Sequence, residues 1–430
     1  MGRPIVFDVS HLSHRMRYSS PSGIEKVDFA FARHFGLAQD KIIAGSQYRR
    51  DRPRVIPPAR VRALIENVQS KWAVDLAIDA DERFQQVRSW IVGELKDRPS
   101  LADRDTRAKE FVANAVSRWR RDVLRFFPTC DIEIPEGAIY LNVAQHALET
   151  AVYFSWLSER PDLQRVFFVH DLLPLQHPEF WPADHLQLFR RRIACVAEHA
   201  SAVITTSGSV EAALREEMAR RGRPYLRIFA MHFPSPLALS GRTVERDATL
   251  ARSNYFVAIN TIEPRKNHLL LLDVWRELAR LGAAAPKLVL IGKRGWKSDI
   301  VTGAIDSEPA LRSLIVEAAG LSDAGLQTLL ASANALLAPS FAEGYGLPIV
   351  EALTLRTPVI ASDIPVFREV SQQRAVFRNP GDLAGWVEAT KALSQRDSTL
   401  AEQARSAASA YLPMTGEAYF AAVEAFLASL

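Results

Sequence analysis

Short apolar runs, separated by helix-length amphipathic segments, recur along this 430-residue chain and constrain its fold more than any other feature. Several are rich in Val and Ile without polar alternation, which is typical of strands covered on both faces of a parallel sheet. The pattern predicts an α/β protein with two doubly wound, Rossmann-like domains facing across a cleft, and a ligand near the carboxyl ends of the strands. The predicted strands are 5–9, 139–143, 166–169, 203–206, 256–259, 288–291, 335–338 and 359–361.

A polar stretch at 233–248, with two prolines and a glycine, predicts the linker between the domains. We expect an N-terminal domain at 1–240 and a C-terminal domain at 241–405. An Arg-rich, helix-biased segment at about 49–127 is interpreted as a helical insertion in the first domain, where an acceptor-facing surface can lie. The last segment, 406–430, is expected to be a C-terminal helix that can cross back to the first domain.

Composition places the chain among ordinary globular proteins, with 48% hydrophobic and 24% charged residues. The two cysteines, Cys130 and Cys195, lack metal-ligand spacing, which argues against a disulfide framework or structural zinc and fits a reducing compartment. The N-terminus lacks the apolar core of a signal peptide, and no apolar run approaches the roughly 18 residues of a spanning helix. We therefore expect a cytoplasmic protein that can also work at the inner face of the membrane.

Several kinds of site are excluded by motif and charge. Two Asp-x-Asp spacings, Asp79/Asp81 and Asp103/Asp105, follow no predicted strand, so we interpret them as solvated faces and expect no metal. Dinucleotide, P-loop, zinc-protease and hydrolase motifs are missing from the sequence. The net charge of +4 permits an anionic ligand or membrane surface without requiring either, and we expect no nucleic-acid partner.

The segment 340–353 carries the strongest functional signal. After the predicted strand 335–338 comes a glycine-bearing loop and then a helix that opens at Pro348, a residue suited to the first helical turn. Such a helix start, with free N–H groups and a positive dipole end, favours an anion. Glu343 and Glu351 flank this helix start, and carboxylates accept hydrogen bonds from paired hydroxyls, so the pattern suits a nucleotide sugar. The loop backbone expected to face the nucleotide sugar belongs to Gly344, Tyr345, Gly346 and Leu347.

The alternative for this segment is an ordinary loop-to-helix turn with a capping carboxylate. A second group follows the predicted strand 256–259, where Arg265 and Lys266 open a buried helix. Cations at a helix N-terminus oppose its dipole, so a bound diphosphate would explain them. The alternative is a solvated basic helix start.

Two further groups are weaker candidates. His170 and Asp171 end the predicted strand 166–169, where His170 can contact a sugar or leaving group and Asp171 can orient its ring. A structural His–Asp pair is the alternative. Gly23 opens a helix after the first strand and can let the backbone approach a phosphate, although an ordinary turn explains it equally well.

These blocks together resemble a known family. Glu343 to Glu351, the Glu-Pro-Arg-Lys-Asn run, the stretch 290–296 and His170-Asp171-Leu-Leu-Pro occur in the order found in retaining glycosyltransferase family 4, which has the GT-B fold and an E-x7-E signature. The resemblance implies that Glu351 holds the ribose hydroxyls and Glu343 the donor sugar. It places Arg265 and Lys266 on the diphosphate and His170 beside the transferred sugar, with neither metal nor enzyme nucleophile.

Three features depart from the family pattern. The first-domain loop has one glycine, Gly23, where the family often has two. Asn260 stands in the donor site where a basic residue is usual six positions before the lysine, so Lys293 or Arg294 would have to compensate. Arg356 replaces the usual glycine of a turn and must avoid or tolerate a left-handed conformation.

The sequence therefore predicts a retaining hexosyltransferase of surface-polysaccharide assembly, lipopolysaccharide included. Its partners are a nucleoside-diphosphate sugar, with GDP-mannose or a related GDP-sugar favoured on family analogy, and a saccharide or lipid-linked acceptor. Alternatives are a sugar-nucleotide epimerase or phosphorylase of the same fold. A third is an inactive membrane-peripheral scaffold, in which the basic-aromatic stretch 118–127 would contact an anionic membrane.

Overall fold

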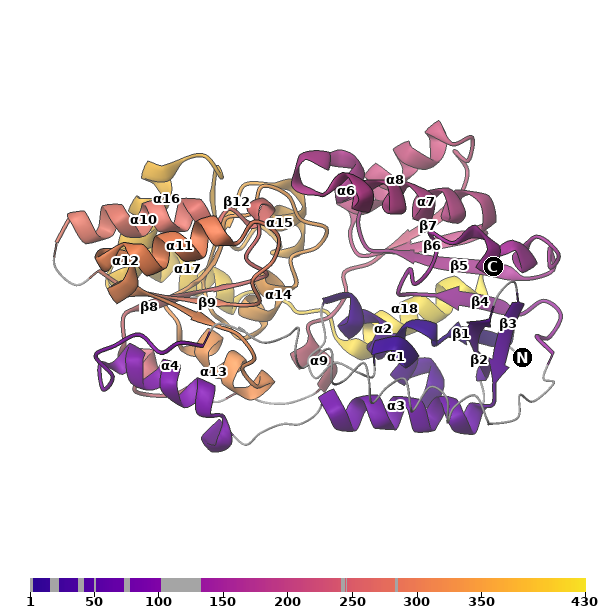
Figure 1. The fold of residues 1–430 in the computed structure, drawn as a ribbon, viewed down its shortest axis with the longest axis horizontal. Coiled ribbons are helices and arrows are strands. Elements are labelled where there is room, and N and C mark those ends of the chain that lie inside the picture. Colours follow the sequence, from indigo (N-terminus) through magenta and orange to yellow (C-terminus); the bar gives the residue numbers. More distant parts are fainter. Residues whose placement is uncertain are drawn as a thin grey trace. The chain divides into compact units, whose positions relative to one another are not determined.

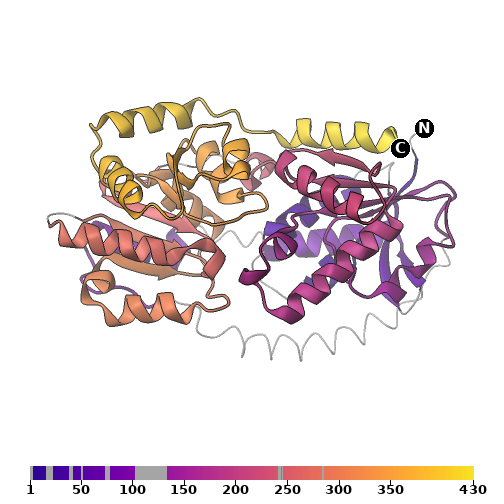
Figure 2. The ribbon, with the colours of Figure 1, turned by 90° about the horizontal axis from the view of Figure 1, so that it is seen from above.

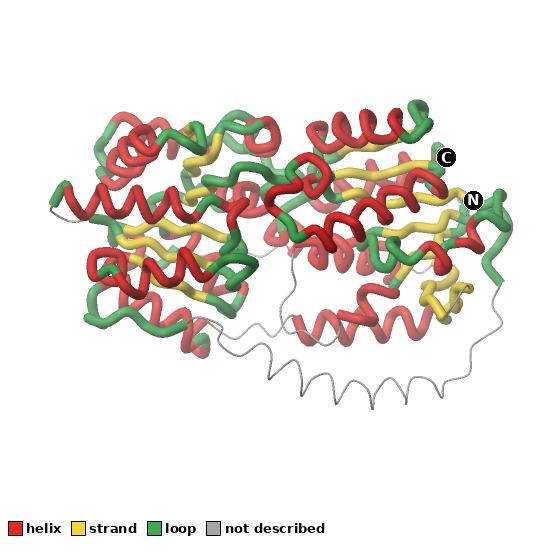
Figure 3. The backbone as a smooth tube through the Cα atoms, turned by 45° about the horizontal axis from the view of Figure 1, so that its top comes forward, coloured by secondary structure: helices red, strands yellow, loops and turns green. Residues whose placement is uncertain are grey.

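The computed structural model describes residues 3–15, 23–37, 42–49, 52–72, 78–101, 133–240, 244, 246–282 and 285–430. Within them the chain forms two units, and each contains a sheet flanked by helices (Figures 1 and 3). The first unit comprises 1–74, 105–233 and 415–430, and the second comprises 75–104 and 234–414. Two Rossmann-like α/β halves, as expected from the sequence, are confirmed.

The first unit is built on a seven-stranded sheet in the order β3-β2-β1-β4-β5-β6-β7. All neighbours are parallel except the edge pair β2 and β3, which is antiparallel. The strands are β1 Ile5–Asp8, β2 Ile42–Arg49, β3 Arg52–Ile56, β4 Ile139–Asn142, β5 Gln164–Val169, β6 Ala202–Thr205 and β7 Arg227–Ala230. The helices are α1 Ser10–Arg15, α2 Gly23–Leu37, α3 Pro58–Trp72, α6 Leu173–Gln176, α7 Ala183–His199, α8 Gly208–Arg220 and α18 Gly416–Ala428.

The second unit repeats the same strand order in a six-stranded, all-parallel sheet, β10-β9-β8-β11-β12-β13. The strands are β8 Tyr255–Ile259, β9 Lys287–Ile291, β10 Ile315–Ala318, β11 Leu336–Ala338, β12 Val359–Ser362 and β13 Val376–Arg378. The helices are α4 Glu82–Val92, α9 Pro236–Ser240, α10 His268–Arg280, α11 Asp299–Ser307, α12 Pro309–Leu314, α13 Asp323–Ser332, α14 Leu347–Thr354, α15 Pro365–Val370, α16 Leu383–Ser394 and α17 Thr399–Ser409.

The strand order reverses once in each sheet, between β1 and β4 and between β8 and β11. In such sheets the loops that leave the carboxyl ends of these two central strands diverge to opposite faces and open a crevice for a ligand. Each unit therefore has one switch point, defined here as the carboxyl ends of β1 and β4 or of β8 and β11. Both central pairs are almost wholly buried and mostly apolar, which fixes the position of the polar loops that follow.

Helices cover both faces of the second sheet (Figure 1). One face packs against α10, α11, α12 and α16, and the other against α4, α13, α14 and α15. Helix α10 shows why these helices pack on the sheet. Its apolar residues recur at helical spacing along one side, and Trp275 on that side is fully buried.

Helix α4 belongs to the second unit, whereas the sequence placed it in a helical insertion of the first domain. Its side chains Phe84, Val87 and Trp90 enter the core under the second sheet, and Arg88 pairs with Asp247 at 2.7 Å. The same stretch also contains a strand, β3, where a helical segment was expected. Helix α3, in the same stretch, belongs to the first unit. Residues 102–127, with Asp103, Asp105 and the stretch 117–127, lie outside the described residues, as does Cys130 beyond them.

The C-terminal segment is two helices where the sequence predicted one. Helices α17 and α18 are separated by 410–415, which contains Pro413, a residue that cannot continue a helical hydrogen-bond ladder. The second of them, α18, belongs to the first unit (yellow in Figure 2), where Tyr419 and Phe420 contact Phe31 of α2 edge to face. Among the described residues, no helix combines the length and apolarity that crossing a bilayer requires.

Candidate donor site

Charged side chains meet where β8 and β11 end, at the switch point of the second unit. Arg265 and Lys266 lie in the short turn Pro264–Lys266 after β8, and Glu343 lies in the loop between β11 and α14. Nη1 of Arg265 donates to Oε2 of Glu343 at 2.8 Å, and Nζ of Lys266 contacts Oε1 of the same carboxylate. These three side chains, only 12–13% exposed, form what we call the donor cluster.

The donor cluster holds its charges in place by mutual attraction. Burial alone would raise the pKa of Glu343, but Lys266 and Arg265 outweigh it and lower that pKa to about 2. Burial lowers the pKa of Lys266, against the opposing effect of Glu343. Arg265 also donates to Oε1 of Glu263 at 2.9 Å. Carboxylates of the chain itself thus balance these cations, so a bound anion is not required to explain them.

Backbone contacts fix the two loops against each other. The amide of Phe341 donates to the carbonyl of Arg265 at 2.9 Å, and Nη1 of Arg265 donates to the carbonyl of Ala342 at 2.7 Å. Asn267 adopts a left-handed conformation at φ 56°, which asparagine tolerates better than most residues. Its Nδ2 donates to the carbonyls of Pro339 and Pro380, at 3.1 and 2.9 Å. The turn is thereby anchored to the loops after both β11 and β13.

Ser340 is a member of this site that the sequence reasoning missed. Its Oγ donates to Oε1 of Glu343 at 3.0 Å, which gives that carboxylate a neutral partner besides the two cations. The spacing of three residues between serine and glutamate was the available signal, but it is too common in loops to be specific.

The predicted strand, loop and helix around Glu343 are confirmed as β11, 339–346 and α14, although the helix begins at Leu347 instead of Pro348. Gly346 has φ 98°, and a Cβ there would lie 2.8 Å from Cε1 of Phe367, so both conformation and space require glycine. Gly344 is buried and Tyr345 packs against the core of the second unit. Glu351 is half-buried on α14.

Asn260 lies directly after β8, beside Gly292. A Cβ on Gly292 would lie 1.9 Å from the carbonyl oxygen of Asn260, so only glycine lets these two loops approach. Oδ1 of Asn260 is buried and has no hydrogen-bond partner within the described ranges. Of the two cations considered as substitutes for a basic residue at 260, Arg294 is already held by Glu317 through two hydrogen bonds of 2.8 Å. Lys293 is therefore the better candidate to supply the positive charge that the family pattern places at position 260.

The other predicted residues lie in the first unit. Nε2 of His170 is 2.8 Å from the carbonyl oxygen of Val143, and burial lowers the pKa of His170 to about 4. The ring is thus neutral near pH 7, with Nε2–H donating and Nδ1 left to accept. Oδ1 of Asp171 accepts from the amide of Leu173 at 3.0 Å, at the start of α6. Gly23 begins α2, is exposed, and has open space where a Cβ would be.

One predicted surface residue is buried. Asp81, expected on a solvated face, is 3% exposed and caps two segments: Oδ1 accepts from the amide of Phe84 and Oδ2 from that of Ser322. Asp79 is exposed, as expected. In the part of the chain that the structure describes, no group of His, Cys, Asp and Glu residues has the geometry of a metal site.

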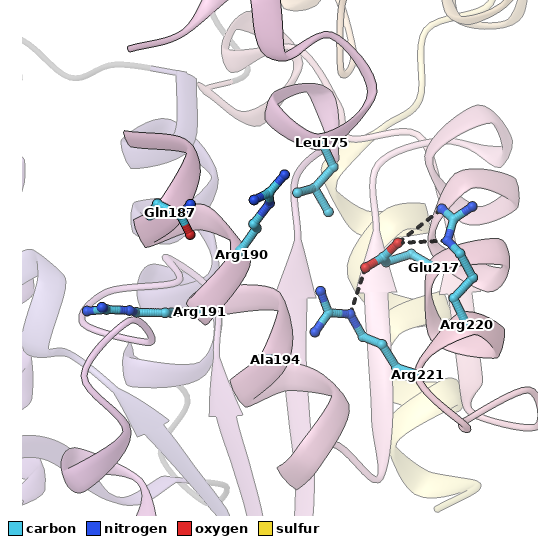
Figure 4. Close-up of a pocket in the computed structure, with 8 residues that line it drawn as sticks. All are labelled: Leu175, Gln187, Arg190, Arg191, Ala194, Glu217, Arg220 and Arg221. Atoms are coloured by element: carbon cyan, nitrogen blue, oxygen red, sulfur yellow. Dashed lines mark hydrogen bonds and ion pairs between the residues drawn. The ribbon is translucent and has the colours of Figure 1, made fainter. Parts of the chain in front are cut away.

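A cavity of about 420 Å³ lies between α7 and α8 of the first unit (Figure 4). Its walls carry Arg190 and Arg191 from α7, while Glu217 of α8 binds Arg220 and Arg221, its neighbours along the chain. None of the predicted donor-site residues lines this cavity.

Comparison with known proteins gives the site a family context. Residues 253–396 match the family model of glycosyl transferases group 1. The chain is 33% identical over 247 residues to the serotype-specific mannosyltransferase WbdA of Escherichia coli, a match covering 54% of this chain and 30% of WbdA. It is 33% identical over 147 residues to the O-antigen chain mannosyltransferase RfbU of Salmonella typhimurium, covering 34% of this chain and 39% of RfbU. The chain thus spans well under half the length of these curated relatives.

Solved structures share the fold at low sequence identity. Anabaena Alr3699/HepE, solved in complex with UDP, aligns over the full length of both chains with a TM-score of 0.54 and 16% identity. A sucrose-phosphate synthase from Thermosynechococcus elongatus aligns with 68% of this chain and 74% of its own, with a TM-score of 0.52 and 17% identity. These neighbours confirm the predicted GT-B fold class. The part of the chain that carries Arg265, Lys266, Glu343 and Glu351 therefore matches the group 1 glycosyl transferases and lies in a protein of GT-B fold.

Proposed function

We propose that this protein is a retaining glycosyltransferase that moves a hexose from a nucleoside-diphosphate sugar to a hydroxyl of a saccharide or lipid-linked saccharide. The donor cluster is the observation that carries this proposal. Two cations and a carboxylate, all largely buried, converge at the switch point of the second sheet, next to the N-terminus of α14. A diphosphate can take the place of Glu343 as a partner of the two cations, and the carboxylate oxygens can accept hydrogen bonds from sugar hydroxyls, as the chemistry needs.

The charges suit departure of a diphosphate. The bond between the anomeric carbon and the diphosphate oxygen breaks, and charge builds up on the phosphate and on an oxocarbenium-like sugar. Arg265 and Lys266 stabilise the departing phosphate, which takes the proton of the attacking hydroxyl. Glu343 keeps both cations in position and binds hydroxyls of the sugar, while Glu351 binds the ribose. Because nothing in this scheme requires a metal or an enzyme nucleophile, none is assigned.

The donor is proposed as GDP-mannose or a related GDP-sugar, and the product as a surface polysaccharide made on the cytoplasmic side. This choice is supported by relatives named as mannosyltransferases, two of them of O-antigen chains. His170, neutral and fixed by Val143, offers its Nδ1 to a hydroxyl of the transferred sugar.

The test measures release of GDP from GDP-mannose with methyl α-D-mannopyranoside as the probe acceptor. Lys266→Ala should lower turnover by about 10²-fold or more, because one preorganised positive charge on the leaving group is lost. Lys391→Ala, which removes an exposed lysine of α16, is the matched control and should turn over like the wild type.

Product stereochemistry tests retention. The anomeric proton and carbon signals of the product should report an α-mannoside from the α-configured donor, whereas a β-mannoside would contradict the retaining mechanism. Unchanged turnover in Lys266→Ala would remove the donor cluster from catalysis. A wild-type protein that transfers from none of the UDP, GDP, dTDP and ADP sugars would instead be the inactive scaffold considered above.

A further inference from the structure

A second polar cluster occupies the switch point of the first unit, where β1 and β4 end. Asp8, the last residue of β1, is 3% exposed. Its Oδ2 accepts from Oη of Tyr140 at 2.6 Å and from Nδ2 of Asn142 at 2.8 Å, and its Oδ1 accepts from the amide of Ser10 at 3.0 Å. The carboxylate thus ties the two central strands together and fixes the start of α1, which carries His11.

His11 forms a dyad with Asp28 of α2. Its Nδ1 lies 2.9 Å from Oδ2 of Asp28, whose side chain is fully buried, while the His11 side chain is 15% exposed. Oδ1 of Asp28 is buried and has no hydrogen-bond partner in the described part of the chain. A pair that served packing alone would rarely leave a buried carboxylate oxygen unsatisfied. Burial raises the pKa of Asp28, against the opposing effect of His11.

The far side of the His11 ring carries Nε2. Nδ1 is the nitrogen that contacts Asp28, and Nε2 has no hydrogen-bond partner among the described residues. The His146 ring lies 5.7 Å away between centroids, and burial lowers the pKa of His146, which keeps that ring neutral. The other titratable groups whose charges reach this cluster are Asp8, Asp28, His170 and the ion pair of Glu149 with Arg192, whose side chains are 2.8 Å apart.

The charge around Nε2 selects the kind of ligand. Asp8 and Asp28 place two acidic side chains beside the His11 and His146 rings, and the cation Arg192 is bound to Glu149 at 2.8 Å, so the cluster does not favour an anion such as a phosphate. A hydroxyl group, which carries no charge and can donate or accept a hydrogen bond, suits an imidazole nitrogen. The switch point of a doubly wound sheet is also where such folds place their ligands.

We propose that His11, held by Asp28, forms a hydrogen bond through Nε2 with a hydroxyl of the acceptor saccharide, and that His146 lines the same subsite. Asp28 is a positioning residue, because it acts through the ring of His11. This inference rests on the proposed function, since it names where that reaction takes its second substrate. It requires no proton transfer to His11.

The first experiment measures separate Michaelis constants of the 430-residue protein for its two substrates, GDP-mannose and methyl α-D-mannopyranoside. His11→Gln and Asp28→Asn should each raise KM for the mannoside by about tenfold while KM for GDP-mannose stays within twofold. The matched control is His34→Gln, because His34 lies on the same helix α2 and also pairs with a carboxylate, Glu424, at 3.0 Å. That variant should keep both constants.

The second experiment reads binding without turnover. The Cε1–Hε1 NMR signal of His11, assigned by its loss in His11→Gln, should shift when methyl α-D-mannopyranoside is added, and half-saturation should need about tenfold more mannoside in Asp28→Asn. If neither the signal nor KM for the mannoside responds, the acceptor subsite is refuted while the Lys266→Ala result still decides the proposed function. If the signal shifts but the wild type transfers no sugar, the transferase is refuted and the saccharide site stands.

Discussion

Nη1 of Arg265 lies 2.8 Å from Oε2 of Glu343, although the two residues are 78 positions apart in the chain. They meet because β8 and β11 are neighbours at the reversal of strand order, so the loops that follow them share one edge of the sheet. The contact is a consequence of topology, and under the proposed function Glu343 would compete with the diphosphate for the two cations of the donor cluster.

Replacing Glu343 with Gln should separate binding from turnover. Without that carboxylate, Arg265 and Lys266 lose a strong competitor for phosphate, so affinity for free GDP should rise about tenfold while turnover falls about 10²-fold. Isothermal titration calorimetry and the GDP-release assay measure the two effects. Glu388→Gln removes an exposed carboxylate of α16 and serves as control. Weaker GDP binding in the Glu343 variant would show that Glu343 does not compete with the diphosphate.

Glu343 should also stabilise the fold in a defined pH range. Its pKa is lowered to about 2 in the folded protein, from an ordinary value of 4.5. Its contribution is therefore complete above about pH 4.5 and is lost as the pH falls toward 2, because the unfolded chain then binds the proton first. Urea unfolding at several pH values should show a smaller loss of stability on acidification in Glu343→Gln than in wild type. Parallel curves for the two proteins would contradict the ion-paired carboxylate.

Glu351→Ala should weaken nucleotide binding through the ribose. Because GDP and GDP-mannose share that ribose, calorimetry should show similar losses for both, about tenfold each. Glu388→Ala is the exposed control. A loss confined to GDP-mannose would move Glu351 to the hexose, and unchanged affinity for both would remove it from the donor site.

Gly292→Ala should destabilise the second unit. The added Cβ would lie 1.9 Å from the carbonyl oxygen of Asn260, so the loops after β8 and β9 must separate, at a cost of about 1–3 kcal/mol or more. Gly303→Ala in α11 has open space and should be neutral or slightly stabilising. Urea unfolding of the two variants provides the comparison. Equal stability of both would mean that the close approach of the two loops is not required.

Arg356 shows that residues far away in the sequence can support a backbone conformation that looks unfavourable locally. Arg356 has φ 62°, so it tolerates the conformation that the sequence flagged as a difficulty. Its guanidinium donates through Nη1 to the carbonyls of Ser409 and Tyr411, at 2.9 and 2.5 Å. The hydrogen bonds that Arg356 donates to the end of α17 and to the turn after it thus offset a backbone cost that glycine would avoid.

The strands that sequence reasoning found and missed differ in position. Every predicted strand is an interior strand of its sheet, covered on both faces and so a continuous apolar run. Those missed are the edge strands β3, β7, β10 and β13, together with β2 beside an edge. Of the edge strands, β7 and β13 are only half-buried or exposed, so their apolar signal is weak. The edge strand β10 is fully buried, but Glu317 interrupts its apolar run of four residues.

The sequence by itself determined the interior strands, the order of the loops after them and the chemical character of those loops. It marked Arg265, Lys266, Glu343 and Glu351 because charged residues after buried strands stand out locally. Only the tertiary structure decided which of these residues touch, that Ser340 and Asn267 fix their geometry, and that His11 meets Asp28. Only it placed α4 in the second unit and α18 in the first. The physical reason is that an apolar pattern specifies that a face is covered, whereas strand order and packing decide what covers it.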